Sequence, residues 1–192
     1  MSLIEVLKSA SDFRSSHGKR HELWFVLLLI IVGAACGYWG YRPAAEFAKR
    51  YGEEVCDFLS IPKPKTMASY STFRRVLLGL DLIAFAELFN RWAADYVDIE
   101  PDEWLSSDGK SIRGSVTDYN SSEQDFISLV SLFSQKRGQV VCALPFHNKQ
   151  MGEEYAVRQM LAAIDLRGAV VTTDALHTKK RLRRFELMEV TT

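Results

Sequence analysis

Two aspartates, Asp108 and Asp174, are the residues of this chain best suited to do chemistry. Each ends a short apolar run, Trp104–Ser107 before the first and Ala169–Thr173 before the second. Two neighbouring carboxylates repel each other and resist full ionisation unless they share a divalent cation. Oxygen ligands of this kind suit Mg²⁺ or Mn²⁺, and a pair of such ions about 4 Å apart promotes phosphodiester chemistry. The pair therefore predicts a metal-dependent site that acts on phosphate esters.

Basic side chains near the first aspartate provide donors for phosphate oxygens. Lys110 and Arg113 follow it closely, and Gly109 lets a backbone or a phosphate approach. The other basic residues that we consider for contact with DNA are Arg74, Arg75, Lys179 and Lys180. The alternative for each charge is an ordinary solvated surface, and for each aspartate taken alone an ordinary turn or helix cap.

The overall composition limits the class of protein. The chain has 192 residues with 24 basic and 24 acidic side chains, so no bulk positive field attracts nucleic acid and any contact must come from local clusters. Its three cysteines, Cys36, Cys56 and Cys142, lie far apart, which argues against a disulfide framework or a zinc site. A reduced, cytoplasmic location fits this pattern.

An uncharged run from Leu23 to Tyr41 raises the question of a membrane segment. It contains 19 residues without a formal charge, and about 18 apolar residues are the usual signal for a membrane span. Its last third is rich in Gly and Ala, so the strongly apolar part, Leu23 to Val32, has the length of a buried core helix. We expect a buried helix, with a small membrane-anchored protein as the alternative.

The first hundred residues show helical periodicity. Apolar residues recur every three or four positions after Leu3 and again after Pro43, and the proline-rich connector Ile61–Lys65 cannot continue a helix. The expected starts of the next two helices are Ser69 or Ser71, and Asp81. We predict an all-helical domain over residues 1–101.

Beyond Pro101 the pattern changes to short β-branched and aromatic runs. The expected elements are strands over Trp104–Ser107, Phe126–Ser134, Val140–Leu144 and Ala169–Thr173, with a helix over Glu153–Leu166 before the last strand. The first three strands can pair as a meander, and the helix supplies the crossover for a parallel fourth strand beside the first. The fold class is therefore α+β, with a sheet that would bring Asp108 close to Asp174.

Three stretches resemble a known family. Residues Asp108–Ser115, Val171–Thr178 and Ser71–Val76 are similar to those of bacterial insertion-sequence transposases of the DDE type, most closely the ISAs-one family and its H-repeat-associated relatives. The resemblance implies a helical transposase-associated domain over residues 1–101. It also implies that residues 102–192 begin a ribonuclease-H-like catalytic domain in which Asp108 and Asp174 are the first two catalytic acids.

The same resemblance implies an activity and partners. The family cuts DNA at the transposon ends with Mg²⁺ and joins the freed 3′-hydroxyl to target DNA. The implied partners are insertion-sequence ends, target DNA, and further copies of this chain or a full-length transposase, with no membrane.

One departure from the family concerns its third catalytic acid. That residue is a Glu on a helix well beyond the second Asp, whereas only 18 residues follow Asp174 here. Glu186 and Glu189 fall on the wrong element to replace it. We therefore expect a C-terminally truncated transposase that is inactive by itself, with a non-catalytic DNA-binding or transposase-interacting module as the alternative.

Overall fold

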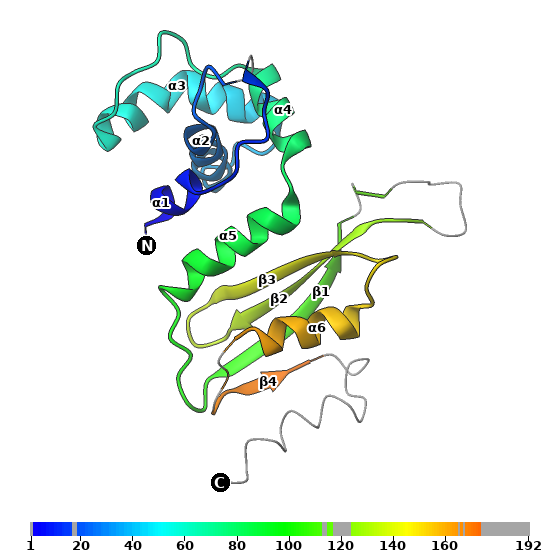
Figure 1. The fold of residues 1–192 in the computed structure, drawn as a ribbon. Coiled ribbons are helices and arrows are strands. Elements are labelled where there is room, and N and C mark those ends of the chain that lie inside the picture. The colour runs from blue at the N-terminus through cyan, green and yellow to red at the C-terminus, as the bar shows by residue number, and fades with distance from the viewer. Residues whose placement is uncertain are drawn as a thin grey trace. The chain divides into compact units, whose positions relative to one another are not determined.

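Helices occupy the first part of the chain and a sheet the second (Figure 1). The computed structural model describes residues 2–16, 19–112, 115–116, 124–164, 166 and 168–173. Within them the fold is α+β, as predicted from the sequence. The chain divides into two compact units, residues 1–81 and 82–192.

The first unit is helical. Its helices are α1 Leu3–Lys8, α2 Leu23–Ala35, α3 Tyr41–Leu59 and α4 Tyr70–Gly79. The capping box between Ser2 and Glu5 starts α1, because each residue's side chain accepts a hydrogen bond from the other's backbone N–H. The buried faces of α3 and α4 recur every three or four residues, the spacing that places side chains on one side of a helix.

Helix α2 forms the core of this unit. Its residues Val26 and Leu29 are fully buried, and the helix ends at Ala35. Gly33 allows α3 to come close, since a Cβ at this position would lie 3.2 Å from the ring of Phe47. The expected buried helix is confirmed. No helix in the described ranges is long and apolar enough to span a bilayer, so the membrane-anchored alternative finds no support.

The second unit contains a four-stranded sheet. Its strands are β1 Trp104–Ser111, β2 Ile127–Ser134, β3 Gln139–His147 and β4 Val170–Thr172, and its helices are α5 Leu82–Ala94 and α6 Glu153–Ala162. The strand order is β3-β2-β1-β4. Strands β1, β2 and β3 pair antiparallel, and β4 lies parallel to β1. This arrangement confirms the predicted meander and the return of the fourth strand to the first.

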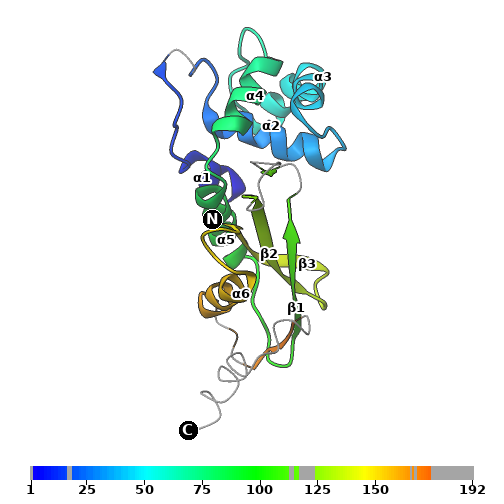
Figure 2. The same ribbon diagram turned by 90° about the vertical axis from the view of Figure 1, so that its right-hand side faces the viewer.

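One face of the sheet carries the core of this unit. Helix α6 packs on β2 and β3, and its Val157 and Met160 are buried with Leu105, Val130 and Leu132 of the strands. Figure 2 shows α5 and α6 on the same side of the sheet. Side chains of a strand alternate between its two faces, so the even-numbered residues of β1 point away from this core.

Helix α5 packs against β3 rather than with the helices that precede it in the sequence. The side-chain amide of Asn90 donates to the carbonyl of Ala143 at 2.8 Å and accepts from its N–H at 2.9 Å. Because β3 is an edge strand, this amide takes the place that another strand would fill. The compact units therefore divide between Asp81 and Leu82, before α5.

Strand β1 is longer than the sequence pattern indicates. The sequence predicts an end at Ser107, with an ordinary Asp108-Gly109 turn as the alternative to a catalytic aspartate, but the strand continues to Ser111. Asp108 pairs with Ser131 and Gly109 with Val130. The long β2 strand offers backbone partners along this whole length, and that pairing outweighs the local turn preference. Asp108 thus lies inside a strand.

Candidate active site

The pairing of β1 with β4 fixes which residues of the two strands lie side by side. Trp104 pairs with Val170, Leu105 with Val171 and Ser106 with Thr172. Every pair joins residues 66 positions apart. Asp108 and Asp174 are also 66 positions apart, and the described part of β4 ends two residues before Asp174.

Asp108 projects from the face of the sheet opposite α6. Leu105, an odd-numbered residue of β1, is fully buried in the core, and the alternation along the strand places Asp108 on the other face with Ser106 and Lys110. Ser131 of β2 is its cross-strand neighbour. The carboxylate is therefore on an exposed surface with hydroxyl groups nearby.

A chain of polar side chains ties β1 to its neighbours just before Asp108. The hydroxyl of Thr172 donates to the carbonyl of Leu105 at 3.1 Å and lies 3.2 Å from the hydroxyl of Ser106. The amide of Gln135 donates to the same Ser106 hydroxyl at 2.8 Å. These contacts hold the end of β4 in register with β1 two residues before the aspartates.

The carboxylate of Asp108 is suited to a hard cation. Within the described residues it forms no salt bridge, and neither does Lys110 on the same face. An exposed carboxylate that no cationic side chain neutralises keeps its oxygens available, and oxygen ligands are what Mg²⁺ and Mn²⁺ prefer. The described residues contain no cluster of three or more His, Cys, Asp or Glu side chains around a common point, so Asp108 alone would not hold an ion.

The other predicted site residues fall in two places. Asp174, Arg113, Lys179 and Lys180 lie outside the described residues. Arg74 and Arg75 are exposed on α4 in the first unit, and the Arg75 Nε donates to the carbonyl of Ser71 at 3.1 Å.

Gly109 has a different neighbour from the one expected. A Cβ at this position would collide with the side-chain carboxylate of Glu153, at the first position of α6. The close approach that Gly109 permits is thus made by Glu153, on the α6 side of the sheet and opposite Asp108. No local sequence pattern indicates this contact, because 44 positions separate the two residues.

Glu103 is a buried acid that sequence reasoning missed. Its side chain is fully buried and accepts hydrogen bonds from the Ser134 hydroxyl and, at 3.0 Å, from the Glu100 N–H, while Arg137 Nε lies 3.6 Å away. The bonds from Ser134 and Glu100, with the charge of Arg137, lower its pKa below the ordinary 4.5. Glu103 precedes β1 and joins its start to the β2–β3 turn, which is a structural role.

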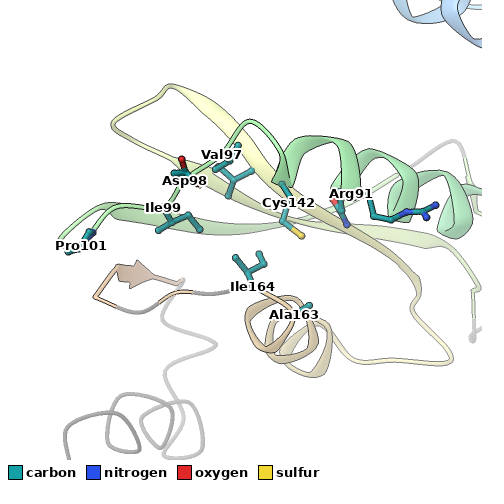
Figure 3. A pocket seen from close by; sticks show the side chains of 11 residues that line it. Arg91, Val97, Asp98, Ile99, Pro101, Cys142, Ala163 and Ile164 are labelled. Carbon is teal, nitrogen blue, oxygen red and sulfur yellow. The ribbon is translucent and has the colours of Figure 1, made fainter. Parts of the chain in front are cut away.

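A mainly apolar pocket of about 640 Å³ lies on the core side of the sheet, between α5, β3 and the end of α6 (Figure 3). Ile99, Cys142 and Ile164 contribute to its wall. Burial raises the pKa of the Cys142 thiol to about 11, so this cysteine stays protonated and unreactive near neutral pH. The pocket lies on the face of the sheet opposite Asp108, so its side chains add no metal ligands beside that aspartate.

Comparison with known protein families supports a relation to DDE transposases. Residues 4–93 match the family described as DDE_Tnp_1-associated. This range covers the helical unit and most of α5.

Curated proteins with similar sequences point the same way. A candidate transposase named YncI from Escherichia coli O157:H7 is 28% identical over 187 residues, which cover 93% of this chain and 45% of that protein. The H repeat-associated candidate transposase YhhI from Escherichia coli K12 is 27% identical over 180 residues, 93% of this chain and 46% of its own. The chain thus spans about half the length of these relatives. No solved structure is significantly similar to this chain.

Proposed function

We propose that residues 102–192 contribute to the DNA-cleaving and strand-transfer site of a DDE-type transposase of the ISAs-one group, with Asp108 and Asp174 as two of its acids. The single observation that carries this proposal is the constant offset of 66 between β1 and β4, which equals the separation of the two aspartates. The family match over residues 4–93 and the transposase-related names of the relatives support it.

The proposal extends the parallel register by two residues. Thr172 pairs with Ser106, and their hydroxyl groups meet on one face of the sheet. Side chains two positions further along each strand return to that same face. A continued register would therefore set Asp174 beside Asp108, as the first strands of a ribonuclease-H-like domain require.

In this site each residue has a distinct task. A bound Mg²⁺ or Mn²⁺ would activate the attacking oxygen and stabilise the leaving one. The carboxylates of Asp108 and Asp174 would hold the cation. Lys110, on the same face as Asp108, would pair with a phosphate oxygen of the DNA, and the Ser106–Thr172 contact would keep the two strands in register.

These 192 residues provide two of the three acids that the resemblance implies. We therefore propose that the chain binds a divalent cation weakly and does not cut DNA without a third acid supplied by other residues or another chain. DNA partners would be the ends of the insertion sequence and the target duplex.

Two assays test this function. In a gel-shift assay the full 192-residue chain should bind a duplex carrying the inverted repeat that flanks its gene at least about tenfold more tightly than a scrambled duplex. Equal affinity for the two duplexes would contradict a role in transposition. In a nicking assay with Mg²⁺ the same chain should leave the duplex intact. If the wild type instead nicks the duplex and Asp108→Asn and Asp174→Asn do not, the two acids suffice for cleavage.

The alternative function is a non-catalytic module that binds DNA or a transposase. The compact helical unit over residues 1–81 is the observation that favours it. Under this alternative, end-specific DNA binding persists while Mn²⁺ binding is the same in the wild type and in Asp108→Asn.

A further inference from the structure

A second, polar pocket of about 390 Å³ lies in the helical unit, where α4 begins. Its wall includes two guanidinium groups, one imidazole and four hydroxyl side chains: Arg20, Arg75, His21, Thr66, Ser69, Ser71 and Thr72. None of the residues that line it is acidic. The pocket is thus built for an anion.

The start of α4 leaves the N–H groups of Tyr70 and Ser71 to an outside acceptor, because the next two amides donate to the Ser69 carbonyl. Ser69 is the N-cap residue, but its hydroxyl makes no capping hydrogen bond and instead contacts the hydroxyls of Ser71 at 2.9 Å and Thr72 at 3.4 Å. The first turn of the helix also contains no acidic residue. An N-terminus without a cap combines N–H donors with the positive end of the helix dipole, which favours an anion.

His21 points to a ligand independently of the helix. The residue is only 8% exposed and lines the pocket, yet none of the hydrogen bonds in the described part of the chain involves its ring. Its backbone carbonyl is occupied, since the Arg14 guanidinium donates to it at 2.8 Å. Burial, together with the charges of Arg20 and Arg14, lowers the pKa of the imidazole, so the ring is neutral at pH 7 and has one N–H to donate. The ring nitrogens are not among the buried unpartnered polar atoms of the described residues, so they keep some contact with solvent and remain free to bond a ligand.

Two guanidinium groups complete the donor set. Arg75 uses its Nε to bond the Ser71 carbonyl at 3.1 Å, which orients its side chain and leaves its terminal N–H groups for a second acceptor. Arg20 approaches from the segment before α2. Guanidinium forks match the oxygen atoms of a phosphate better than a single ammonium does.

We propose that this pocket binds a phosphate group of a nucleic-acid backbone. Uncapped helix amides, hydroxyl groups, a neutral imidazole and two guanidinium groups together satisfy several oxygens of one tetrahedral anion. The cavity is larger than a single phosphate needs, so it also has room for the adjoining sugar. The site lies in a different unit from Asp108, and its existence does not depend on the proposed catalytic function.

The test compares three variants of the full chain. Arg75→Gln removes one donor from the pocket. Thr72→Glu places a carboxylate at the third helical position, where with Ser69 it completes a capping box that stabilises α4 while it fills and repels the anion site. Lys49→Gln is the matched control, because it removes the same charge from an exposed position of α3 that does not line the pocket.

Two ligands distinguish the source of the phosphate. The first arm titrates a fluorescent 20-base-pair duplex and follows its anisotropy at several salt concentrations. We expect Arg75→Gln and Thr72→Glu to weaken binding about 5- to 10-fold and to reduce the salt slope by about 1, as loss of one phosphate contact does, with little change for Lys49→Gln. The second arm adds inorganic phosphate and follows the backbone amide resonances of Tyr70 and Ser71 by NMR.

The outcomes distinguish a backbone phosphate, a free phosphate and the absence of an anion site. Weaker DNA binding in both pocket variants, with phosphate shifts at Tyr70 and Ser71, supports a backbone phosphate. Phosphate shifts that the pocket variants abolish, with DNA binding unaffected, support the oxyanion site and assign it to a free phosphate. No shift with phosphate, or equal loss of DNA affinity in Lys49→Gln and Arg75→Gln, overturns the proposal. A thermal melt that shows Thr72→Glu as stable as the wild type excludes misfolding as the cause.

Discussion

The hydroxyl groups of Ser106 and Thr172 lie 3.2 Å apart across the parallel strands β1 and β4. Thr172 also donates to the Leu105 carbonyl at 3.1 Å, so one side chain links both the hydroxyl and the backbone of the neighbouring strand. This contact fixes the register that would bring Asp174 beside Asp108.

Replacing Thr172 with valine keeps the shape of the side chain but removes both contacts. We expect Thr172→Val to lower the free energy of unfolding by about 1 kcal/mol, the usual net value of such a hydrogen bond. Urea denaturation measures the change. Thr173→Val is the control, since no hydrogen bond among the described residues involves the Thr173 hydroxyl. An equal loss in both variants would show that the Thr172 contacts contribute nothing.

Asn90 protects the free edge of β3. Asn90→Ala removes both hydrogen bonds to Ala143 and exposes its backbone groups, so we expect a loss of about 2 kcal/mol and a greater tendency to aggregate. Glu87→Ala, one turn earlier and exposed on the same helix, should leave stability within about 0.5 kcal/mol of the wild type. Chemical denaturation and light scattering compare the two, and similar values for both variants would refute the protective role.

Glu103 should make stability depend on pH. Its pKa is lowered by hydrogen bonds from Ser134 and Glu100 and by the charge of Arg137, so the ionised form favours the folded state. Its contribution is fully present above the ordinary value of 4.5 and is lost as pH falls through the lowered pKa of the folded state.

The variant Glu103→Gln tests this dependence. We expect it to lose about 2 kcal/mol at pH 7 and to show a shallower decline between pH 5 and pH 3, because the charged hydrogen bonds and the contact with Arg137 are weakened. The exposed neighbour Glu100→Gln should lose no more than about 1 kcal/mol. Thermal melting curves between pH 5 and pH 3 measure this dependence. If stability falls with pH as steeply in Glu103→Gln as in the wild type, other groups cause the acid dependence.

The three cysteines should differ in reactivity. Cys36 is exposed, whereas Cys56 and Cys142 are buried, and burial raises the pKa of both buried thiols. With a pKa of about 11, Cys142 is about 0.1% thiolate at pH 8. Iodoacetamide at pH 8 should therefore modify Cys36 first, as mass spectrometry would show, and rapid modification of Cys142 would mean that its pocket opens.

The order of elements could be predicted from the sequence because it rests on local patterns. Apolar spacing marked α2, and β-branched runs marked the strands, so their limits differ from the expected ones by only a few residues except in β1. There the Asp108-Gly109 pair is a good local turn signal, but β2 pairs with it as a strand. Whether such a pair forms a turn or continues a strand depends on pairing with a distant segment. A single sequence does not show that pairing.

The same limit applies to the sites. Asp108 is a candidate from the sequence alone because an acid that ends an apolar run is a local pattern. The amide of Asn90 on the edge of β3, the burial of Glu103 and the convergence of His21 with Arg75 depend on residues that are distant in the chain. The parallel pairing of β4 with β1 was predicted from topology rules alone, which allowed few alternatives.

We propose that Asp108 and Asp174 share one divalent cation, and a Mn²⁺ titration followed by electron paramagnetic resonance measures this binding. The full chain and the variants Asp108→Asn, Asp174→Asn and Asp102→Asn would be compared. Asp102 is the control, an exposed aspartate whose positive φ of 62° asparagine readily adopts. We expect each of the first two variants to weaken Mn²⁺ binding about tenfold or more, while Asp102→Asn binds as the wild type does. Equal Mn²⁺ affinity in the wild type, Asp108→Asn and Asp174→Asn would show that the two aspartates do not share a cation.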